Sequence, residues 1–302
     1  RAETGRIYIM NLDHCNTHSS FKDPIYMSNL CQEITLPTKP IQHIDDPEGE
    51  IALCILSAIN IGALTLNKEN AELEELCELS VRALEEIIEY QGYPVKAAEI
   101  STKARRSLGI GYIGLAHYLA KHKVKYADKE AWKLVHDLTE SFQYYLLKAS
   151  NKLAEERGAC EYFHRTKYSD GIMPIDTYKE DVNEIVGKKL NHDWTTLRKN
   201  IKQHGLRHST LSAQMPSESS SVVSNATNGI EPPYKLGWKT SYYQNTYDFK
   251  GADDDADQLE QQAVDNKTNG AIINGTNGHT DGQNGNTQTV DQDDEMCDAC
   301  AI

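Results

Sequence analysis

The sequence contains no apolar run long enough to cross a membrane as a helix, and no signal peptide opens it. It also lacks the clustered positive charge that nucleic-acid-binding proteins present. Its seven cysteines are an odd number without the spacing of a disulfide framework. These absences argue against membrane, nucleic-acid-binding and disulfide-stapled classes, and they indicate a cytoplasmic protein with thiols in a reducing environment.

Negative charge is concentrated near the carboxy-terminal end. Residues 251–302 contain 12 acidic residues and a single lysine, whereas the rest of the chain is nearly neutral. The segment 249–302 is rich in Asn, Gly, Thr and Gln without periodicity, so we expect an acidic flexible tail there. Its end carries Cys297 and Cys300, which have the two-residue spacing of redox-active pairs. Because the chain opens on Arg1 rather than Met, we expect a part of a longer product.

Strands that alternate with long amphipathic helices predict an α/β fold over residues 1–248. Apolar side chains that recur every three to four residues indicate the helices, and runs of β-branched and aromatic residues indicate the strands. The predicted helices are 70–90, 129–156, a shorter one after Asp176 and one from Asp193 to Gly205, and the predicted strands are 6–10, 51–59 and 209–213.

Gly109, Gly111 and Gly114 have the spacing of a dinucleotide-binding fingerprint. Two arginines rather than a strand precede them, so we interpret these glycines as positions of close helix packing. Cys77 lies on the apolar face of the predicted helix 70–90 and is expected in the core.

A short stretch near the start combines a thiol with an amide and a carboxylate. In an extended chain, Asn29, Cys31 and Glu33 point to the same side. Leu30 and Ile34 then turn the other way, into the packing. The carboxylate can act as a general base, and the amide can orient a hydroxyl group. From the pattern alone, a buried structural cysteine between two surface polar residues remains an alternative.

His14, Cys15 and His18 are near one another in a polar segment. Their spacing matches no standard zinc pattern, and no second pair of ligands follows. We therefore expect no metal site there.

The motifs of the chain, taken in order, closely resemble those of the large catalytic (alpha) subunit of class I ribonucleoside-diphosphate reductase, in its carboxy-terminal part. The resemblance begins at residues 28–40, which match the finger loop of that family, and it covers nearly all of residues 1–250. The other matching segments are 51–54, 105–111, 215–221, 225–233 and 242–246, with Cys297 and Cys300 at the end. The family implies a ten-stranded α/β barrel whose central finger loop carries a reactive cysteine.

The resemblance implies reduction of ribonucleoside diphosphates to deoxyribonucleoside diphosphates by thiyl-radical chemistry. By position, Cys31 would become the thiyl radical that abstracts the 3′-hydrogen. Glu33 would take the proton of the 3′-hydroxyl group, and Asn29 would hold the ribose hydroxyls. Cys54 matches one member of the cysteine pair that supplies two electrons and becomes a disulfide. Its partner in the family lies upstream of this chain.

Further residues take roles from the same resemblance. Small hydroxyl side chains and free backbone N–H groups suit a segment that holds the substrate diphosphate. Adjacent phenols can pass an electron and a proton in turn. The residues concerned are Pro216, Ser217, Glu218, Ser219 and Ser220 for the diphosphate, Tyr242 and Tyr243 for a radical relay, and Cys297 and Cys300 for a redox shuttle.

The family also implies the partners. This chain would bind no cofactor itself, since the radical comes from a metal-containing small subunit. ATP and deoxynucleotide effectors would bind the amino-terminal part that this chain lacks. The implied partners are the ribonucleoside diphosphate, the small subunit, thioredoxin or glutaredoxin, and a complementing amino-terminal polypeptide. Neither a nucleic acid nor a membrane is expected among them.

Two departures from the family keep other functions open. The first half of the barrel is absent, and Pro233 runs directly into Tyr234 where the family has a long intervening segment. We therefore expect an internal deletion near 233/234. One alternative is a non-catalytic remnant that folds and binds partners. The other is a thiol carrier that acts through the terminal cysteine pair.

Overall fold

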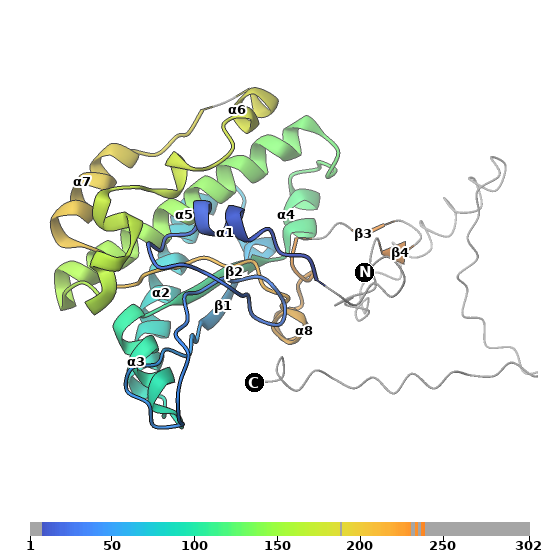
Figure 1. The fold of residues 1–302 in the computed structure, drawn as a ribbon. Coiled ribbons are helices and arrows are strands. Elements are labelled where there is room, and N and C mark those ends of the chain that lie inside the picture. Colours follow the sequence, from blue (N-terminus) through green and yellow to red (C-terminus); the bar gives the residue numbers. More distant parts are fainter. Residues whose placement is uncertain (1–7, 188, 231–232, 235–236, 239–302) are drawn as a thin grey trace, which may run out of the picture.

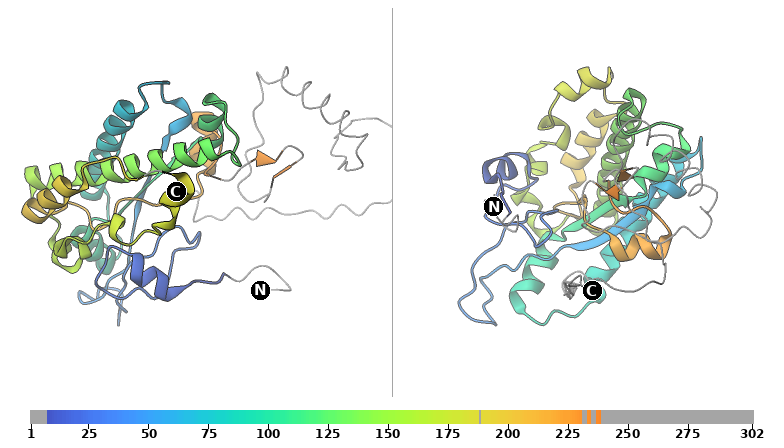
Figure 2. Two further views of the ribbon diagram at one scale, coloured as in Figure 1. Left: turned by 90° about the horizontal axis from the view of Figure 1, so that it is seen from above. Right: turned by 90° about the vertical axis from the view of Figure 1, so that its right-hand side faces the viewer.

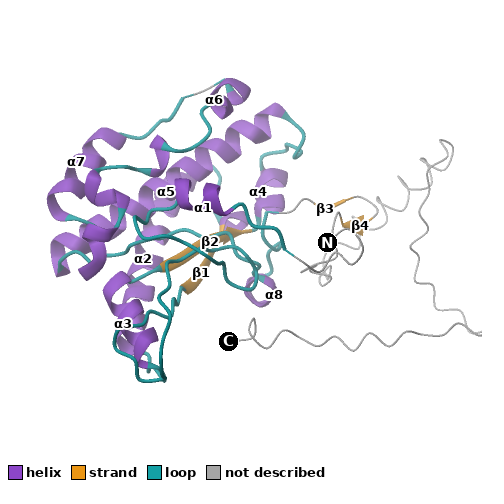
Figure 3. Cartoon of the chain, in the orientation of Figure 1, coloured by secondary structure: helices purple, strands orange, loops and turns teal. Residues whose placement is uncertain are grey.

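The computed structural model describes residues 8–187, 189–230, 233–234 and 237–238. A parallel pair of strands, β1 (Ile55–Asn60) and β2 (Leu108–Ile113), crosses the middle of the molecule, with Ile55 opposite Leu108 and Asn60 opposite Ile113 (Figure 1). Helices and loops make up most of the rest (Figure 3). The described chain is therefore a mixed α/β structure.

The predicted strand 209–213 lies beside β2 as an extended segment. The backbone N–H of Leu108 donates to the carbonyl of Thr210 at 3.1 Å, and the N–H of Ala213 donates to the carbonyl of Ile110 at 3.1 Å. Only the pair Ile110 and Ser212 has regular parallel bridging. The segment thus follows β2 without forming a full strand.

Two long helices cover the strands, as their sequence patterns predict. Helix α2 (Glu69–Tyr90) packs against both strands and against α5 (Lys129–Arg157). The side chains of Leu73, Cys77 and Val81 are buried along α2, which confirms Cys77 as a core residue. Figure 2 shows α5 running along the length of the molecule, with the amino-terminal segment in dark blue on one side of it.

Shorter elements complete the described fold. Asp193 begins α7 as predicted, because its carboxylate accepts a hydrogen bond from the backbone N–H of Thr196 at 2.9 Å. The remaining helices are α1 (Leu12–His18), α3 (Lys96–Arg105), α4 (Leu115–Lys121), α6 (Asp181–Val186), α7 (Trp194–His204) and α8 (Glu218–Ser224). Single turns of 3-10 helix are η1 (Ile61–Ala63), η2 (Glu161–Arg165), η3 (Lys167–Asp170) and η4 (Pro174–Asp176), and a small antiparallel pair is β3 (Pro233–Tyr234) with β4 (Gly237–Trp238).

A buried charged cluster joins α2 to α5 and to the residues that follow α3 and α7. The carboxylate of Glu85 is fully buried and accepts hydrogen bonds from Arg106 at 2.8 and 2.9 Å and from Arg207 at 2.7 Å. Nε2 of His208 lies 3.1 Å from the same carboxylate, and Nδ1 lies 2.9 Å from the hydroxyl of Ser150. A neutral imidazole satisfies both contacts if Nε2–H donates to Glu85 and the serine O–H donates to Nδ1.

A second charged cluster fixes the segment that leads into residues 28–34, the stretch that carries Cys31 and is called the thiol stretch below. Arg105 is almost fully buried, and its guanidinium donates to Glu50 at 2.6 Å and to Asp23 at 3.0 Å. Arg165 donates to the same two carboxylates, at 3.2 and 3.1 Å. The planar guanidinium groups stack on the ring of Tyr162. Two carboxylates and two guanidiniums thus tie four distant parts of the sequence together.

Three predictions about the fold need correction. Tyr8 to Met10 form no strand, although the prediction covered residues 6–10. The predicted strand 51–59 begins only at Ile55, because the preceding backbone turns to bond with α3 through Ile51 N–H and the carbonyl of Ala97 at 3.2 Å. The glycines 109 and 111 lie inside strand β2 rather than in helix packing. Their close neighbours are β1 and the residue before it, Cys54, together with the extended segment around Ala213.

The predicted ten-stranded barrel is not visible in the described residues. Their strands form two sheets of two strands each, and neither sheet closes. The barrel therefore stays a prediction for a more complete protein.

Candidate functional site

The thiol stretch forms a tight loop rather than an extended chain. The backbone N–H of Asn29 donates to the carbonyl of Ile34 at 3.3 Å, and the N–H of Gln32 donates to the carbonyl of Asn29 at 3.2 Å. The side-chain oxygen of Asn29 accepts a further bond from the N–H of Ile34 at 3.3 Å. Gln32 has φ of 59°, in the left-handed region that closes such turns. Cys31 lies in this turn, between the two residues that close it.

The alternation of faces that we predicted for the stretch is therefore wrong. Leu30 is 54% exposed instead of packed. Ile34 does pack inward, against the small cluster of Phe21, Ile25 and Leu36. A sequence with alternating polar and apolar residues is equally compatible with a loop when one side-chain amide can satisfy its backbone, as Asn29 does here.

A cavity of about 220 Å³, called the thiol cavity below, nevertheless brings three of the predicted site residues together. Asn29 and Glu33 line it from the loop, and Cys54 lines it from the residue that precedes β1. Cys31 is half-buried and is not among the residues that line this cavity. Sequence reasoning missed the apolar walls, because their spacing carries no signal of a shared cavity; these are Met27, Ile34, Leu36, Ala52, Leu53 and Leu56.

The carboxylate of Glu33 acts on the thiol of Cys54 across this cavity. Burial raises the pKa of Cys54 to about 12, and the negative charge of Glu33 adds to that rise. Cys54 therefore stays a protonated thiol near neutral pH. Among the described residues, one carboxylate oxygen of Glu33, Oε2, is buried without a hydrogen-bond partner. A buried acceptor of this kind marks a place where a bound hydroxyl group could donate.

Replacing Glu33 by glutamine should make the Cys54 thiol more reactive. Removal of the carboxylate charge lowers the pKa of Cys54 and so raises its thiolate fraction at a given pH, while burial, the larger cause, remains. We expect alkylation of Cys54 by iodoacetamide to become faster, by less than about tenfold. Peptide mass spectrometry of the isolated chain, over a series of alkaline pH values, measures this rate.

Glu48→Gln is the matched control, because Glu48 is an exposed carboxylate that pairs with Lys39 on a surface turn. Its variant should alkylate at the rate of the unmodified chain. If Glu33→Gln and Glu48→Gln behave alike, the carboxylate of Glu33 does not act on the Cys54 thiol.

The predicted diphosphate segment leads into helix α8. Ser217 is buried, and its backbone N–H donates to the side-chain oxygen of Asn228 at 3.0 Å. Glu218, Ser219 and Ser220 are exposed in the first turn of α8. A helix thus begins within the segment. Its role in binding a diphosphate stays a prediction.

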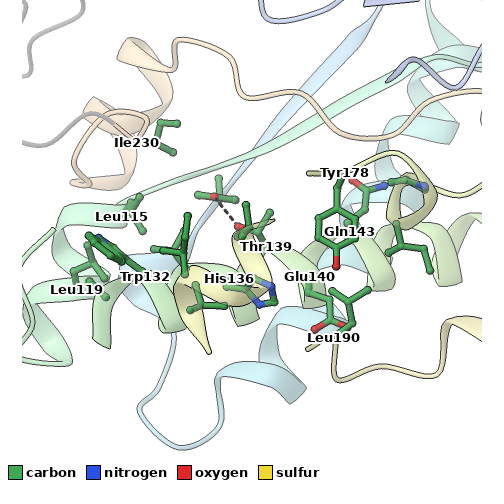
Figure 4. A pocket seen from close by; sticks show the side chains of 18 of the residues that line it. Leu115, Leu119, Trp132, His136, Thr139, Glu140, Gln143, Tyr178, Leu190 and Ile230 are labelled. Carbon is green, nitrogen blue, oxygen red and sulfur yellow. Dashed lines mark hydrogen bonds between the residues drawn. The ribbon is translucent and has the colours of Figure 1, made fainter. Parts of the chain in front are cut away.

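A second cavity, larger than the first, lies elsewhere among the described residues and is mainly apolar. It has a volume of about 630 Å³ and lies between α4, α5 and the segment around α6 (Figure 4). Trp132, His136 and Thr139 of α5 point into this region, and Tyr178 lies across from them. Trp132 is 40% exposed because it lines this open cavity. No predicted site residue lines it.

His136, Asp137 and Glu140 beside this cavity are close enough to share a cation. The carboxylate of Glu140 already accepts hydrogen bonds from the backbone N–H of Asn191 at 2.7 Å and from the indole of Trp194 at 3.0 Å. These bonds join the chain before α7 to α5, so we interpret the group as structural. Of the three residues considered as metal ligands in the sequence, His14 and His18 both lie on α1, with ring centroids 6.1 Å apart.

The remaining predicted site residues lie outside the described part of the chain. They are Tyr242, Tyr243, Cys297 and Cys300. Within the described residues, no helix combines the length and the apolar character needed to cross a membrane.

Comparison with known proteins gives a match over residues 1–294 to the family described as "Ribonucleotide reductase, barrel domain". The ribonucleoside-diphosphate reductase subunit alpha of Haemophilus influenzae is 60% identical over 237 residues, which are 77% of this chain and 31% of that protein. The protein of the same name from Buchnera aphidicola is 58% identical over 236 residues, 77% of this chain and 30% of the relative. Ribonucleoside-diphosphate reductase 1 subunit alpha of Escherichia coli is 58% identical over 236 residues, 77% of this chain and 31% of the relative. The chain thus spans less than a third of the length of these relatives.

Proposed function

Because the chain belongs to the ribonucleotide reductase barrel-domain family, we propose that it serves as the carboxy-terminal part of the alpha subunit of a ribonucleoside-diphosphate reductase. The reaction is the reduction of ribonucleoside diphosphates to deoxyribonucleoside diphosphates, which supplies precursors for DNA replication. Its close relatives are named for this activity. Since the chain spans about 30% of their length, we propose that it acts together with an amino-terminal polypeptide.

One observation supports this proposal most strongly. Asn29, Glu33 and Cys54 reach the same cavity although 20 residues separate Glu33 from Cys54. The cavity combines an amide, a carboxylate with a buried unpaired oxygen, and a thiol that stays protonated. These are the groups that removal of a ribose hydroxyl requires: hydrogen-bond orientation, a proton acceptor and a source of reducing equivalents.

We assign the steps by the position of each residue. Cys31, as a thiyl radical, takes the hydrogen atom from C3′ of the ribose. Glu33 accepts the proton of the 3′-hydroxyl group, and Asn29 holds the ribose hydroxyls. The 2′-hydroxyl leaves as water after it receives a proton from the cysteine pair, to which Cys54 belongs. That pair supplies two electrons and becomes a disulfide, with one of its hydrogens leaving in the water and the other ending on C2′. Glu33 returns its proton to the 3′-oxygen, and Cys31 returns its hydrogen atom to C3′ and becomes a thiyl radical again. The second cysteine of the pair would come from the amino-terminal polypeptide.

The diphosphate would bind where the segment from Pro216 to Ser220 enters α8. Its exposed first turn offers backbone N–H groups and serine hydroxyls to phosphate oxygens. Ala213, near the thiol cavity, is four residues before Ser217. Four extended residues span at most about 14 Å, a distance that fits a nucleoside diphosphate with its ribose at the cavity.

Residues outside the described part would connect this site to its partners. Tyr242 and Tyr243 would carry the radical from a metal-containing small subunit to Cys31. Cys297 and Cys300, on the acidic tail 249–302, would pass electrons from thioredoxin or glutaredoxin to the active-site disulfide. ATP and deoxynucleotide effectors would bind the amino-terminal polypeptide.

We also propose the architecture and the location of the complete protein. Residues 1–248 would form one side of a ten-stranded α/β barrel, with the loop of Cys31 as its finger. The strands β1 and β2 would then be two of the ten, with a deletion of the family's intervening segment near 233/234. The protein would act in the cytoplasm.

A second candidate function is a non-catalytic remnant that folds and binds partners. Its support is the short span of the chain, about 30% of its relatives.

Complementation separates the two candidates. We expect no sustained turnover from the isolated chain with a small subunit and dithiothreitol, because the cysteine pair is incomplete. Addition of a polypeptide that covers the amino-terminal part of a relative should restore deoxynucleotide formation over many turnovers. Activity that stays absent, when the same polypeptide restores a homologous carboxy-terminal fragment from a relative, would favour the remnant.

A further inference from the structure

Two chain segments approach each other unusually closely at the thiol cavity. Gly109 lies in β2 directly opposite Leu56 of β1, and Cys54 is two residues before Leu56. A Cβ atom added to Gly109 would lie 2.7 Å from Sγ of Cys54 and 2.6 Å from Cδ2 of Leu56. Carbon and sulfur atoms that are not bonded do not approach this closely, so any side chain at position 109 must move its neighbours.

The neighbours of Gly109 differ in how freely they can move. Leu56 is 45% exposed, so its side chain can rotate toward solvent at little cost. Sγ of Cys54 is also the free end of a side chain, and its open side is the cavity that it shares with Glu33. The third neighbour, Cβ of Ala213 at 3.2 Å, is fixed by its backbone but is far enough away to need only a small shift. An alanine at position 109 would thus displace the thiol rather than the backbone.

Gly111, in the same strand, meets a different kind of neighbour. A Cβ atom there would contact the backbone oxygen of Ala213 and the sulfur of Met215. That backbone oxygen can move only if the segment beside β2 moves with it. Gly111 is therefore required for the close approach of two backbones, whereas the space at Gly109 is occupied by side-chain ends.

We propose that Gly109 is a positioning residue for Cys54, because the missing side chain leaves the space in which the Cys54 sulfur lies. This inference rests on the proposed function, in which Cys54 forms and breaks a disulfide. Disulfide geometry is strict, with a sulfur–sulfur bond of about 2.05 Å and a narrow range of dihedral angles. A sulfur displaced toward the cavity would no longer meet its partner in that geometry. The spacing that resembles a nucleotide-binding fingerprint would instead serve a thiol.

The test measures the alkylation of Cys54 in the isolated chain as a function of pH. In Gly109→Ala the sulfur should move out of its buried position into the cavity. Burial is the larger cause of the raised pKa of Cys54 and the charge of Glu33 is the smaller one, so the loss of burial should outweigh an approach to Glu33 and shift the pH profile of alkylation to lower pH. A shift of one pKa unit increases the rate at a fixed pH below the pKa by about tenfold. Gly92→Ala is the control, because no atom lies within 4 Å of a Cβ at Gly92.

A double variant identifies the neighbour that matters. Leu56→Ala combined with Gly109→Ala removes the contact with leucine but keeps the contact with sulfur, so the shifted profile should persist. The inference is overturned if folded Gly109→Ala keeps the profile of the unmodified chain, or if the added Leu56→Ala restores that profile.

If Gly109→Ala does not fold, circular dichroism of Gly109→Ala with Cys54→Ala decides the question. Recovery of folding on removal of the sulfur supports the inference, and failure to recover overturns it. None of these measurements requires turnover. An unchanged pH profile of alkylation would thus refute the role of Gly109 and leave the reductase proposal intact. Failed complementation would count against the reductase proposal but would leave the effect of Gly109 on the position of the Cys54 sulfur untouched.

Discussion

Replacement of Cys31 by serine is expected to abolish deoxynucleotide formation in the enzyme assembled with an amino-terminal polypeptide and a small subunit. The chemistry proposed for Cys31 needs a sulfur–hydrogen bond weak enough to be broken and remade in each turnover. A serine O–H bond is too strong for that exchange. Product formation in a radioactive nucleotide assay should fall to background, while the affinity for the ribonucleoside diphosphate should stay nearly unchanged.

Cys15→Ser provides the control for this experiment. Cys15 is a half-buried thiol on α1, outside the residues that line the thiol cavity, and it has no proposed role in the reaction. Its variant should turn over normally. Normal turnover by Cys31→Ser would contradict the radical assignment, and a loss of nucleotide affinity along with activity would indicate that the loop itself had collapsed.

Replacement of Glu85 by alanine is expected to lower the free energy of unfolding more than any other substitution proposed for this chain. The variant leaves the buried Arg106 with only the exposed Glu89 as a carboxylate partner, and it removes the carboxylate partner of the half-buried Arg207. Removing one partner from a buried ion pair typically costs about 3–5 kcal/mol. Glu86→Ala is the matched control, because Glu86 is the next residue of α2 and forms an exposed pair with Arg157. Its unfolding free energy in urea should change by no more than about 0.5 kcal/mol.

The pH dependence of stability provides a second measurement of this cluster. Burial alone would raise the pKa of Glu85, but hydrogen bonds from His208, Arg106 and Arg207 outweigh it and hold that pKa well below its ordinary value of 4.5. A carboxyl group with a lowered pKa in the folded state contributes stability above its unfolded pKa, and the contribution is lost as the pH falls below that value. The unmodified chain should therefore lose stability below about pH 4.5, and Glu85→Ala should lack this component.

His208 adds a loss in the same direction at higher pH. Burial lowers its pKa from the ordinary value of 6.5, so the folded state holds a neutral imidazole. As the pH falls below 6.5, the unfolded chain takes up a proton that the folded chain resists, and stability decreases. Urea titrations at several pH values between neutral and acidic should show the two losses in succession. A free energy that does not depend on pH in this range would mean that the cluster is not buried as described.

The long helices could be predicted from the sequence because they are amphipathic over many turns. The predicted helix 70–90 begins at Glu69 and ends at Tyr90, and Asp193 caps α7 as expected. The strands were harder to predict, since short apolar runs do not show where pairing starts. β1 begins at Ile55 because the backbone N–H of Ile51 bonds to the carbonyl of Ala97, near the start of α3. No local property of residues 51–54 indicates that contact.

The site was only partly predictable for the same reason. The family resemblance brought Asn29, Glu33 and Cys54 into one hypothesis, and the structure places them around one cavity. The predicted local geometry was wrong, because a hydrogen bond from the backbone N–H of Ile34 to the side-chain oxygen of Asn29 favours a loop over a strand. Gly109 was also assigned to the wrong environment. Its proximity to the Cys54 sulfur depends on the register of two strands that are separated by more than 40 residues.

That separation has a consequence for the order in which the chain folds. The contacts of α2 with its own turns and with α3 are close in sequence, and we expect them to form quickly because little chain entropy is lost. Pairing of Ile55 with Leu108 must wait until the intervening helices α2 and α3 have condensed. The cavity around Cys54 is thus expected to assemble late, and pulsed hydrogen exchange should show β1 and β2 protected after α2. A reactive thiol would then be accessible to solvent during most of folding, so the yield of refolded protein should depend on a reducing environment.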